Sequence, residues 1–121
     1  MAGVRPSDIN MCSIYDCFTI TVMVTLEDAG FCKKGEVGPW VEETDLTYKG
    51  KLPVNTHGGQ LSWGQPVGTS AGGMTHVMDA TEQLMGRSGE RQVPNCELAF
   101  VEGNGGILGE HESIILGRQP S

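Results

Sequence analysis

The sequence predicts an α/β fold in which helices cover a small, layered sheet. Three observations lead to this prediction: two segments with apolar residues at helical spacing, three short segments with strand-like composition, and clusters of glycine between them. The predicted order is strand, helix, loop, helix, strand, strand. A sheet packed between helices normally contains more than three strands, so we expect the chain to be one part of a larger layered fold.

The first strand and the first helix are predicted near the N-terminus. Residues 11–15 form a strand-like run after a turn at 6–8. A helix follows, because apolar residues recur three or four positions apart until Gly30, and Asp16 is expected to cap it. The β-branched run at 20–25 also permits a strand, but the length, cap and stop favour a helix. The apolar stripe consists of Phe18, Val22, Leu26 and Ala29.

The middle of the chain is predicted to contain two loops and a second helix. Residues 31–54 are polar and rich in Gly and Pro, which predicts a loop with room for one hairpin. A glycine-rich loop is expected at 55–68, and Thr69 or Ser70 then caps a helix that ends near Gly86. The stripe expected to face inward consists of Met74, Val77, Met78, Thr81, Leu84 and Met85.

The last two strands are predicted at 96–103 and 111–118. Both segments contain runs of apolar and β-branched residues, and a glycine-rich turn separates them. This pattern indicates an antiparallel hairpin at the end of the domain.

Composition and charge limit the possible functions. The chain of 121 residues and 12.9 kDa is one domain at most, spanning 1–121, and its formal net charge of −7 argues against nucleic-acid binding. No apolar run reaches the roughly 18 residues that a membrane span needs, and the N-terminus lacks the apolar stretch of a signal peptide, so we expect a cytoplasmic protein. The four cysteines have no CxxC spacing, which favours free thiols over zinc binding or disulfides.

Three motifs lie at the turns of this predicted fold. They are YDCF at 15–18, NTHGGQLSWGQPVGTSAGG at 55–73 and EGNGG at 102–106. In this order and spacing the set resembles the thiolase family, most closely the C-terminal region of the sterol-carrier-protein and lipid-transfer-protein types. Thiolases consist of two βαβαβαββ halves stacked in α-β-α-β-α layers, and this chain is similar to the latter part of the second half. The resemblance accounts for the low number of strands.

The resemblance implies an activity and a partner. The family catalyses Claisen condensation or its reverse, thiolysis of a 3-ketoacyl-CoA, so an acyl-CoA would be the substrate, and no bound cofactor or metal is expected. The family's nucleophilic cysteine lies in the first half, and none of the four cysteines here sits in that motif. The resemblance therefore implies that another portion, in the same chain or a separate one, supplies the nucleophile, that this chain alone is inactive, and that a homo-oligomer forms.

The resemblance also assigns site residues by position. Tyr15 stands where the family has His or Asn, Gln65 where it has the His of Gly-His-Pro, and Glu102 where it has a second catalytic cysteine. The Gln65 amide can donate a hydrogen bond but cannot shuttle a proton, and a carboxylate is a poor substitute for a thiol that activates a second substrate. Backbone N–H groups of the glycine motifs would face thioester oxygens. The implied substrate-binding residues are Asn55, Gly58, Gly59, Asn104, Gly105 and Gly106.

Two further residues have two interpretations each. His57 lies inside the glycine-rich loop, where it could face the site as a donor or base, or hold the loop by bonding a nearby carbonyl. Cys17 could be a reactive thiol near a helix N-terminus, or a packing residue as in the family. His76 and His111 carry no predicted function.

Two alternatives to an acyltransferase stay open. Tyr15 is compatible with a retro-aldolase of the lipid-transfer-protein type, which cleaves steroid side-chain acyl-CoAs together with a zinc-ribbon and OB-fold protein. A phenol at that position can give a proton to, or take one from, a tertiary alkoxide. The other alternative is a non-catalytic module that binds acyl-CoA or forms a dimer surface. As part of a larger enzyme, the isolated chain should expose apolar faces that the rest would cover.

Overall fold

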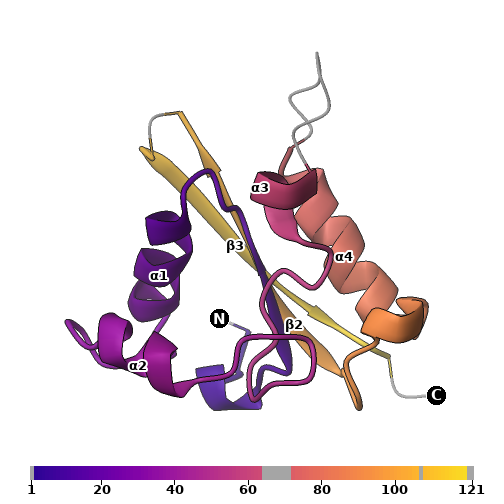
Figure 1. The fold of residues 1–121 in the computed structure, drawn as a ribbon. Helices are drawn as coiled ribbons and strands as arrows, with labels where there is room; N and C mark the ends of the chain where they lie inside the picture. The colour runs from indigo at the N-terminus through magenta and orange to yellow at the C-terminus, as the bar shows by residue number, and fades with distance from the viewer. Residues whose placement is uncertain (1, 64–71, 107, 120–121) are drawn as a thin grey trace.

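A mixed sheet lies between two layers of helices in the computed structural model, which describes residues 2–63, 72–106 and 108–119 (Figure 1). Within this part of the chain, the first two strands are parallel and the last two form an antiparallel hairpin. The predicted order of strands is therefore confirmed. The strands, in their spatial order, are β1 (Met11–Ile14), β2 (Leu98–Gly105) and β3 (Glu110–Gly117).

Helices cover both faces of the sheet (Figure 1). α1 and α2 lie on one side and α3 and α4 on the other, so the layered α/β arrangement expected from the sequence is confirmed. The helices are α1 (Thr19–Asp28), α2 (Val37–Glu43), α3 (Gly59–Trp63) and α4 (Met74–Leu84), with short 3-10 turns at Pro6–Asp8 and Gly89–Arg91. No helix in the described ranges is long and apolar enough to cross a membrane.

β1 is buried on both faces and bonded along both edges. One edge pairs with β2, with Met11 opposite Ala99. On the other edge Cys12 N donates to Pro53 O at 2.8 Å, and Cys12 forms a parallel bridge with Val54. The prediction of a loop and hairpin at 31–54 is therefore wrong, because this segment forms α2 and then returns to extend the sheet beside β1.

Two hydrophobic clusters fill the two sides of the sheet, because successive residues of a strand point to opposite faces. On the α4 side the buried cluster consists of Met11, Ala80, Leu84, Val93, Cys96, Ala99 and Val101. On the α1 side it consists of Ile9, Cys12, Ile14, Leu26, Leu52 and Phe100. Every functional side chain on β1 or β2 is thereby assigned to one face or the other.

α1 is a helix, as its apolar spacing predicted, but its expected cap is wrong. Phe18 occupies the N-cap position and makes no side-chain cap bond. The Asp16 carboxylate instead accepts the backbone N–H groups of Gln60 at 2.7 Å and Leu61 at 3.2 Å. Asp16 therefore caps α3 and not α1. The two residues between Asp16 and α1 form a bend, which separates Asp16 from the start of its own helix.

α4 buries a largely polar face, so the predicted inward stripe is wrong for its methionines, although its Leu84 is buried and its Val77 packs against the core cluster. Met74, Met78 and Met85 are 55%, 52% and 58% exposed. The helix buries polar side chains because they meet hydrogen-bonding partners on the sheet and in the chain segments before and after the helix. The buried residues are Thr75, His76, Asp79, Ala80, Gln83 and Leu84. The helix ends before Gly86, at φ +70, as predicted, whereas Thr69 and Ser70 lie outside the described residues.

Candidate functional site

A buried network of polar side chains joins β1, α4 and the loop that begins at Asn55, directly after the residue that bridges to β1. Ser13 Oγ lies 3.0 Å from His76 Nδ1 and donates to Asp79 Oδ2 at 3.1 Å, and His57 Nδ1 lies 3.1 Å from the same oxygen. A carboxylate can only accept, so the hydroxyl hydrogen of Ser13 goes to Asp79 and its oxygen accepts from Nδ1–H of His76. This order fixes the tautomer of His76.

Burial controls the charge of His76. Burial, together with the nearby His57, lowers the pKa of His76 to about 4, although the carboxylates of Asp16 and Asp79 act in the opposite direction. His76 is therefore neutral at pH 7 and keeps a lone pair on Nε2. That nitrogen lies 3.5 Å from Asp16 Oδ1 and has no hydrogen-bond partner among the described residues. It is a buried acceptor atom inside the network.

Asp79 is the anion at the centre of the network. Burial acts to raise its pKa, but hydrogen bonds from His57, Thr56 and Ser13 and the charge of His57 outweigh burial, and the pKa is lowered. Thr56 Oγ1 donates to Asp79 Oδ1 at 2.6 Å, and Arg91 Nη1 lies 3.8 Å from the same oxygen. A buried carboxylate compensated in this way stays ionised at neutral pH and can orient His57.

Asn55 positions the end of β1 and the start of the loop. Its Oδ1 accepts the backbone N–H of Ile14 at 2.7 Å, and its Nδ2 donates to Ile14 O at 2.9 Å. The side chain thus replaces a neighbouring strand at the last residue of β1. Asn55 itself has φ +52, which turns the chain sharply into the loop. Tyr15 follows directly, so Asn55 also fixes where Tyr15 lies.

Gly59 allows the loop to approach Asp16 closely. A Cβ atom added to Gly59 would lie 2.2 Å from Asp16 Oδ2, and its φ of +67 also favours glycine. Gly58 has φ +100 in the preceding position. The close backbone approach expected from the glycine pair is present. The group that the backbone approaches is the Asp16 carboxylate, which caps α3.

The rings of Tyr15 and His57 both contact the His76 ring of this network. The Tyr15 ring centroid lies 5.8 Å from that of His76, and the His57 centroid lies 5.0 Å from His76 on an edge-to-face contact. Tyr15 N donates to Glu102 O at 3.0 Å. Tyr15, His76 and His57 are thereby held on the α4 side at the end of β1.

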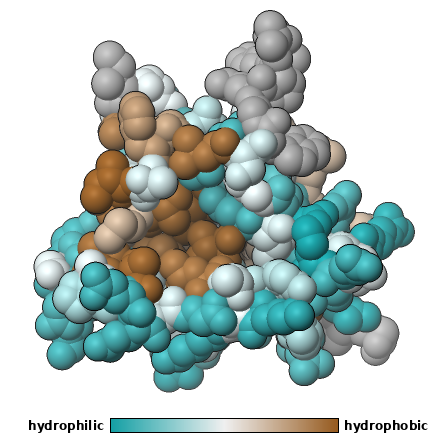
Figure 2. All heavy atoms as spheres, viewed as in Figure 1, coloured by the Kyte–Doolittle hydropathy of each residue, from teal (hydrophilic) through white to brown (hydrophobic). Residues whose placement is uncertain are grey.

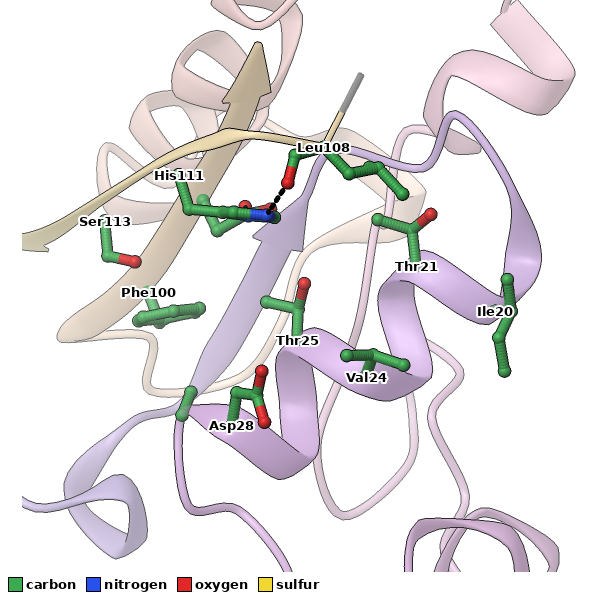
Figure 3. A pocket seen from close by; sticks show the side chains of 11 residues that line it. Ile20, Thr21, Val24, Thr25, Asp28, Phe100, Leu108, His111 and Ser113 are labelled. Carbon is green, nitrogen blue, oxygen red and sulfur yellow. Dashed lines mark hydrogen bonds and ion pairs between the residues drawn. The ribbon is translucent and has the colours of Figure 1, made fainter. Parts of the chain in front are cut away.

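A second, smaller polar group lies on the α1 side. Glu102 is 2% exposed, and its Oε1 lies 2.8 Å from His111 Nδ1, while His111 Nε2 lies 3.2 Å from Leu108 O (Figure 3). The hydrogen bond that His111 donates to Glu102 raises the pKa of His111 against the effect of partial burial. Glu102 Oε2 has no hydrogen-bond partner among the described residues.

This pair borders an apolar groove between α1 and the hairpin. The groove has a volume of about 660 Å³, and Ile20, Val24 and Phe100 contribute its apolar walls. Hydrophobic side chains gather in a hollow between α1 and the sheet (Figure 2), and the close view shows α1 facing His111 and Leu108 across the cavity (Figure 3). An apolar face open to solvent is what we expected of a chain that is part of a larger protein.

Comparison with known proteins assigns the family. The profile of the thiolase C-terminal domain-like family matches residues 1–118. This chain belongs to that family. It is 40% identical to sterol carrier protein 2 of Bos taurus over 108 residues, which are 89% of this chain and 19% of that protein. It is 37% identical to an acetyl-CoA acetyltransferase of Methanothermobacter thermautotrophicus over 109 residues, 90% of this chain and 28% of that enzyme.

A solved structure shows the same fold. The Ltp2-ChsH2(DUF35) aldolase matches with a TM-score of 0.79 and 33% identity, covering 96% of this chain and 28% of that one. The resemblance to thiolases and the partial thiolase-like fold are confirmed. The chain spans about a fifth to somewhat over a quarter of the length of these relatives.

The residues that the thiolase motifs assign fall into two groups. Tyr15, His57 and the loop residues Asn55, Gly58 and Gly59 lie together on the α4 side. The Glu102 side chain lies on the opposite face, beside Phe100. Gln65 lies outside the described residues.

The third motif, EGNGG at 102–106, lies beside the first motif, YDCF at 15–18. Asn104 Nδ2 donates to Tyr15 O at 3.4 Å, and its Oδ1 accepts from Cys17 Sγ at 3.8 Å. Gly105 ends β2, and Gly106 turns the hairpin at φ +63. Cys17 also contacts Thr21 Oγ1 at 3.4 Å, so its side chain is a packing element between α1 and the hairpin.

Sequence reasoning missed the polar face of α4. His76, Asp79 and Gln83 recur three and four positions apart, which is the spacing of one helix face. The methionines have the same helical spacing, which predicts that their face, and not the polar face, points inward. A stripe of polar residues that includes both His and Asp was the signal that could have identified the network, with Ser13 as its partner on β1.

Proposed function

We propose that this chain is the C-terminal portion, or one subunit, of a thiolase-like acyl-CoA acyltransferase that forms or cleaves 3-ketoacyl-CoA. The observation that carries this proposal is the buried network that fixes His57 beside ionised Asp79, below Tyr15, at the end of β1. A base held by an orienting carboxylate is the arrangement that proton transfer at a carbon acid needs. Similarity to an acetyl-CoA acetyltransferase supports the same reaction class.

The proposed reaction divides its tasks between two portions of the enzyme. In condensation, a proton leaves the α-carbon of one thioester, and the enolate attacks an acyl group carried on a cysteine of the nucleophile-bearing portion. A carbon–carbon bond forms and the cysteine thiolate leaves. Thiolysis is the reverse, with a coenzyme A thiol releasing the second acyl-CoA. This chain would supply the groups that move the proton and stabilise the oxyanion.

Each residue of the site receives one task in this proposal. His57, oriented by Asp79, moves the α-carbon proton, and Tyr15 donates a hydrogen bond to the thioester oxygen. Neutral His76 packs its ring against that of Tyr15 and helps to hold Tyr15 in place. The Gln65 amide polarises a thioester oxygen. Backbone N–H groups at Asn104, Gly105 and Gly106 face the same oxygen, and the proposal assigns no step to Glu102.

One observation favours a second candidate, a retro-aldolase that acts on a β-hydroxyacyl-CoA with a zinc-ribbon and OB-fold partner. The structural neighbour is an aldolase complex, and Tyr15 is a residue type that can take the proton of a tertiary alcohol. In that reaction the alkoxide collapses to a ketone, the carbon–carbon bond breaks, and the acyl-CoA enolate is protonated. The same Tyr15–His76 contact would serve this chemistry.

The test is turnover in a reconstituted assembly. We would express the chain with the portion of the Methanothermobacter acetyl-CoA acetyltransferase that it does not match, and assay a 3-ketoacyl-CoA with coenzyme A and, separately, a β-hydroxyacyl-CoA. Tyr15→Phe should reduce kcat by at least about 100-fold, the lower range both for a lost oxyanion donor, its task in the acyltransferase, and for lost acid–base catalysis, its task in the retro-aldolase. Tyr48→Phe is the matched control at the other tyrosine and should change kcat by less than about twofold.

The outcomes separate the candidates. Thiolysis sensitive to Tyr15→Phe supports the acyltransferase, whereas cleavage of the β-hydroxyacyl-CoA alone supports the retro-aldolase. Turnover that Tyr15→Phe leaves unchanged contradicts both assignments of Tyr15. Binding of acyl-CoA without turnover of either substrate would indicate a non-catalytic module.

A further inference from the structure

Gln83 is a buried amide to which the proposed reaction assigns no task. It lies on the inner face of α4 and is 1% exposed. Its Nε2 donates to Arg91 O at 2.7 Å and to Thr56 Oγ1 at 2.8 Å. Its Oε1 accepts the backbone N–H of Val93 at 2.8 Å. Both N–H groups and the oxygen of this side chain are therefore bonded, which fixes its place in the fold.

Backbone groups set the orientation of this amide. The carbonyl of Arg91 can only accept a hydrogen bond, and the N–H of Val93 can only donate one. Turning the amide over would place its oxygen against the Arg91 carbonyl and its NH2 group against the Val93 N–H, so both bonds would be lost. Nε2 of Gln83 therefore faces Thr56 Oγ1 as a donor.

The orientation of Gln83 in turn fixes the hydrogen of Thr56. A hydroxyl has one hydrogen to donate, and Oγ1 accepts from Gln83 on one side while the ionised Asp79 offers only lone pairs on the other. The hydrogen of Thr56 therefore points to Asp79 Oδ1, which lies 2.6 Å from Oγ1. With the N–H groups of Gln83 removed, the hydroxyl would no longer be held in this direction.

Asp79 extends this order to His57. The Thr56 bond holds Oδ1 of the carboxylate, while Oδ2 lies 3.1 Å from Ser13 Oγ and 3.1 Å from His57 Nδ1. A carboxylate held at both oxygens has a fixed plane, and this plane sets the direction in which it meets His57. The backbone beside His57 is held from the same segment as Gln83 Nε2, because Arg91 Nη1 donates to Thr56 O at 3.1 Å.

We propose that Gln83 is a positioning residue for proton transfer, acting through Thr56 and Asp79 on His57. This inference rests on the proposed function, because it takes His57 as the base. A residue of this kind affects kcat and leaves KM nearly unchanged. A purely structural amide, which only ties α4 to the segment at 91–93, would affect stability and leave the titration of Asp79 as it is.

The first measurement is the titration of the Asp79 carboxyl group by carbon-13 NMR in the whole chain. Burial acts to raise the pKa of Asp79, but hydrogen bonds, led by those of His57 and Thr56, lower it overall. Gln83→Met keeps a side chain of similar volume and removes both N–H groups. The bond from Thr56 is then weaker, so the pKa of Asp79 should rise relative to wild type.

The second measurement is a double-mutant cycle in the reconstituted assembly. Gln83→Met should lower kcat for a 3-ketoacyl-CoA with coenzyme A about tenfold, the upper range for one net hydrogen bond, with KM within about twofold. In a Thr56→Val background the same change should lower kcat by less than about twofold, because the hydroxyl that transmits it is absent.

Two controls separate positioning from folding. Gln92→Met changes an amide of the same segment that bonds only backbone groups, among them Ser88 N and Gln83 O, so it should leave the Asp79 titration unchanged. Thr56→Ser keeps the hydroxyl and should keep the pKa of Asp79 near its wild-type position, whereas Thr56→Val should raise it.

A second variant covers the case in which Gln83→Met does not fold, as judged by its circular dichroism melt. Gln83→Glu keeps an oxygen for the Val93 N–H and removes the amide donor that faces Thr56. It should raise the pKa of Asp79, and by less in a Thr56→Val background. An equal rise in both backgrounds would indicate a direct effect of charge and contradict transmission through Thr56.

Three further results would decide the matter. An unchanged Asp79 titration in Gln83→Met, or an equal change in Gln92→Met, would mean a purely structural amide. A loss of kcat that Gln83→Met causes equally in the Thr56→Val background would contradict the proposed route. A raised Asp79 pKa together with an assembly that turns over no acyl-CoA supports the link from Gln83 to Asp79 and contradicts the proposed function, so the two failures are distinguishable.

Discussion

The two faces of the sheet are built from alternate residues of the same strands and each buries a hydrophobic cluster, but the α4 face also buries a network of polar side chains. Toward α4, Ser13 lies between Met11 and Tyr15 and meets His76 and Asp79. Toward α1, neighbouring positions bury apolar side chains beneath an open groove, with Glu102 and His111 at its edge. The alternation of side chains along the strands thus places a closed polar site on one face of the sheet and an open apolar groove on the other.

The difference explains where the chemistry and the contacts should lie. The α4 side buries an ionised carboxylate that several donors satisfy, and such a centre holds its neighbours rigidly. On the α1 side, Ile20, Val24 and Phe100 contribute apolar walls to a groove that is open to solvent. We therefore expect substitutions on the α4 side to affect folding and catalysis strongly, and substitutions in the groove to affect the isolated chain weakly.

The largest effect should come from Asp79→Ala. Removing the carboxylate leaves the buried donors of Ser13, Thr56 and His57 without their acceptor, and losses of about 3–5 kcal/mol are typical for one member of a buried charged group. The measurement is urea unfolding at pH 7. The matched change on the other face, Glu102→Ala, should cost clearly less, because His111 can turn to solvent. Equal losses would contradict the contrast between the faces.

The two histidines should give opposite pH dependences. The pKa of His76 is lowered to about 4, so between about 6.5 and 4 the unfolded chain binds more protons than the folded chain. Stability should fall as the pH drops through this window, by up to about 3 kcal/mol from this residue. Unfolding free energies measured from pH 7 to 4 should show this slope, and His76→Gln should flatten it.

His111 should act in the other direction. Its pKa is raised by Glu102, so the stability it contributes is fully present below about pH 6.5 and is lost as the pH rises through the folded-state pKa. His111→Gln should therefore lower the free energy of unfolding by a constant amount below about pH 6.5 and remove the fall in stability above that pH, without changing the slope that His76 causes between about 6.5 and 4. A steeper acid-side fall in His76→Gln, or a His111→Gln variant as stable as wild type at low pH, would contradict the two assignments.

A smaller effect is expected from Gly59→Ala. The added Cβ would meet the Asp16 carboxylate and the residue would keep a positive φ, so we expect a loss of about 2–3 kcal/mol. Gly89→Ala is the control, because Gly89 has φ +57 and no atom within 4 Å of an added Cβ. It should lose only the backbone component, about 1 kcal/mol. Chemical denaturation of both variants measures the difference, which reports the close approach to Asp16.

The smallest effect is expected in the groove. Val24 is 49% exposed there, so Val24→Ala should change the stability of the isolated chain by less than about 0.5 kcal/mol. Val101→Ala makes the same change at a buried position on the α4 side and should cost about 2 kcal/mol. Thermal melts of the two variants make this comparison. A large loss in Val24→Ala would mean that the groove is closed in the isolated chain.

Much of the fold followed from the sequence because it depends on local patterns. The hairpin around Gly105 and Gly106, the helix ending at Gly30 and the strand before Tyr15 each carry turn or spacing signals within a few residues. The motifs identified the family for the same reason, since their order and spacing are visible in one dimension.

What the sequence did not reveal depends on contacts between distant segments. Asp16 has the residue type and position of a cap for α1, but its carboxylate points to α3, 44 positions away along the chain. The methionines of α4 have core-like spacing, but the face of the helix that meets the sheet consists of Ala80 and Leu84 together with polar side chains such as Asp79, so the methionines face outward. Intrinsic residue preferences cannot distinguish a face that packs within this chain from one that meets another portion.

The most direct measurement compares two histidine variants, one on each face, in the reconstituted assembly. Turnover of a 3-ketoacyl-CoA with coenzyme A would be measured for His57→Gln and His111→Gln at pH 7. If the α4 side performs the proton transfer, His57→Gln should lower kcat by at least about 100-fold and His111→Gln by less than about twofold. Equal turnover in both variants, or a greater loss in His111→Gln, would contradict the assignment of the chemistry to the α4 side.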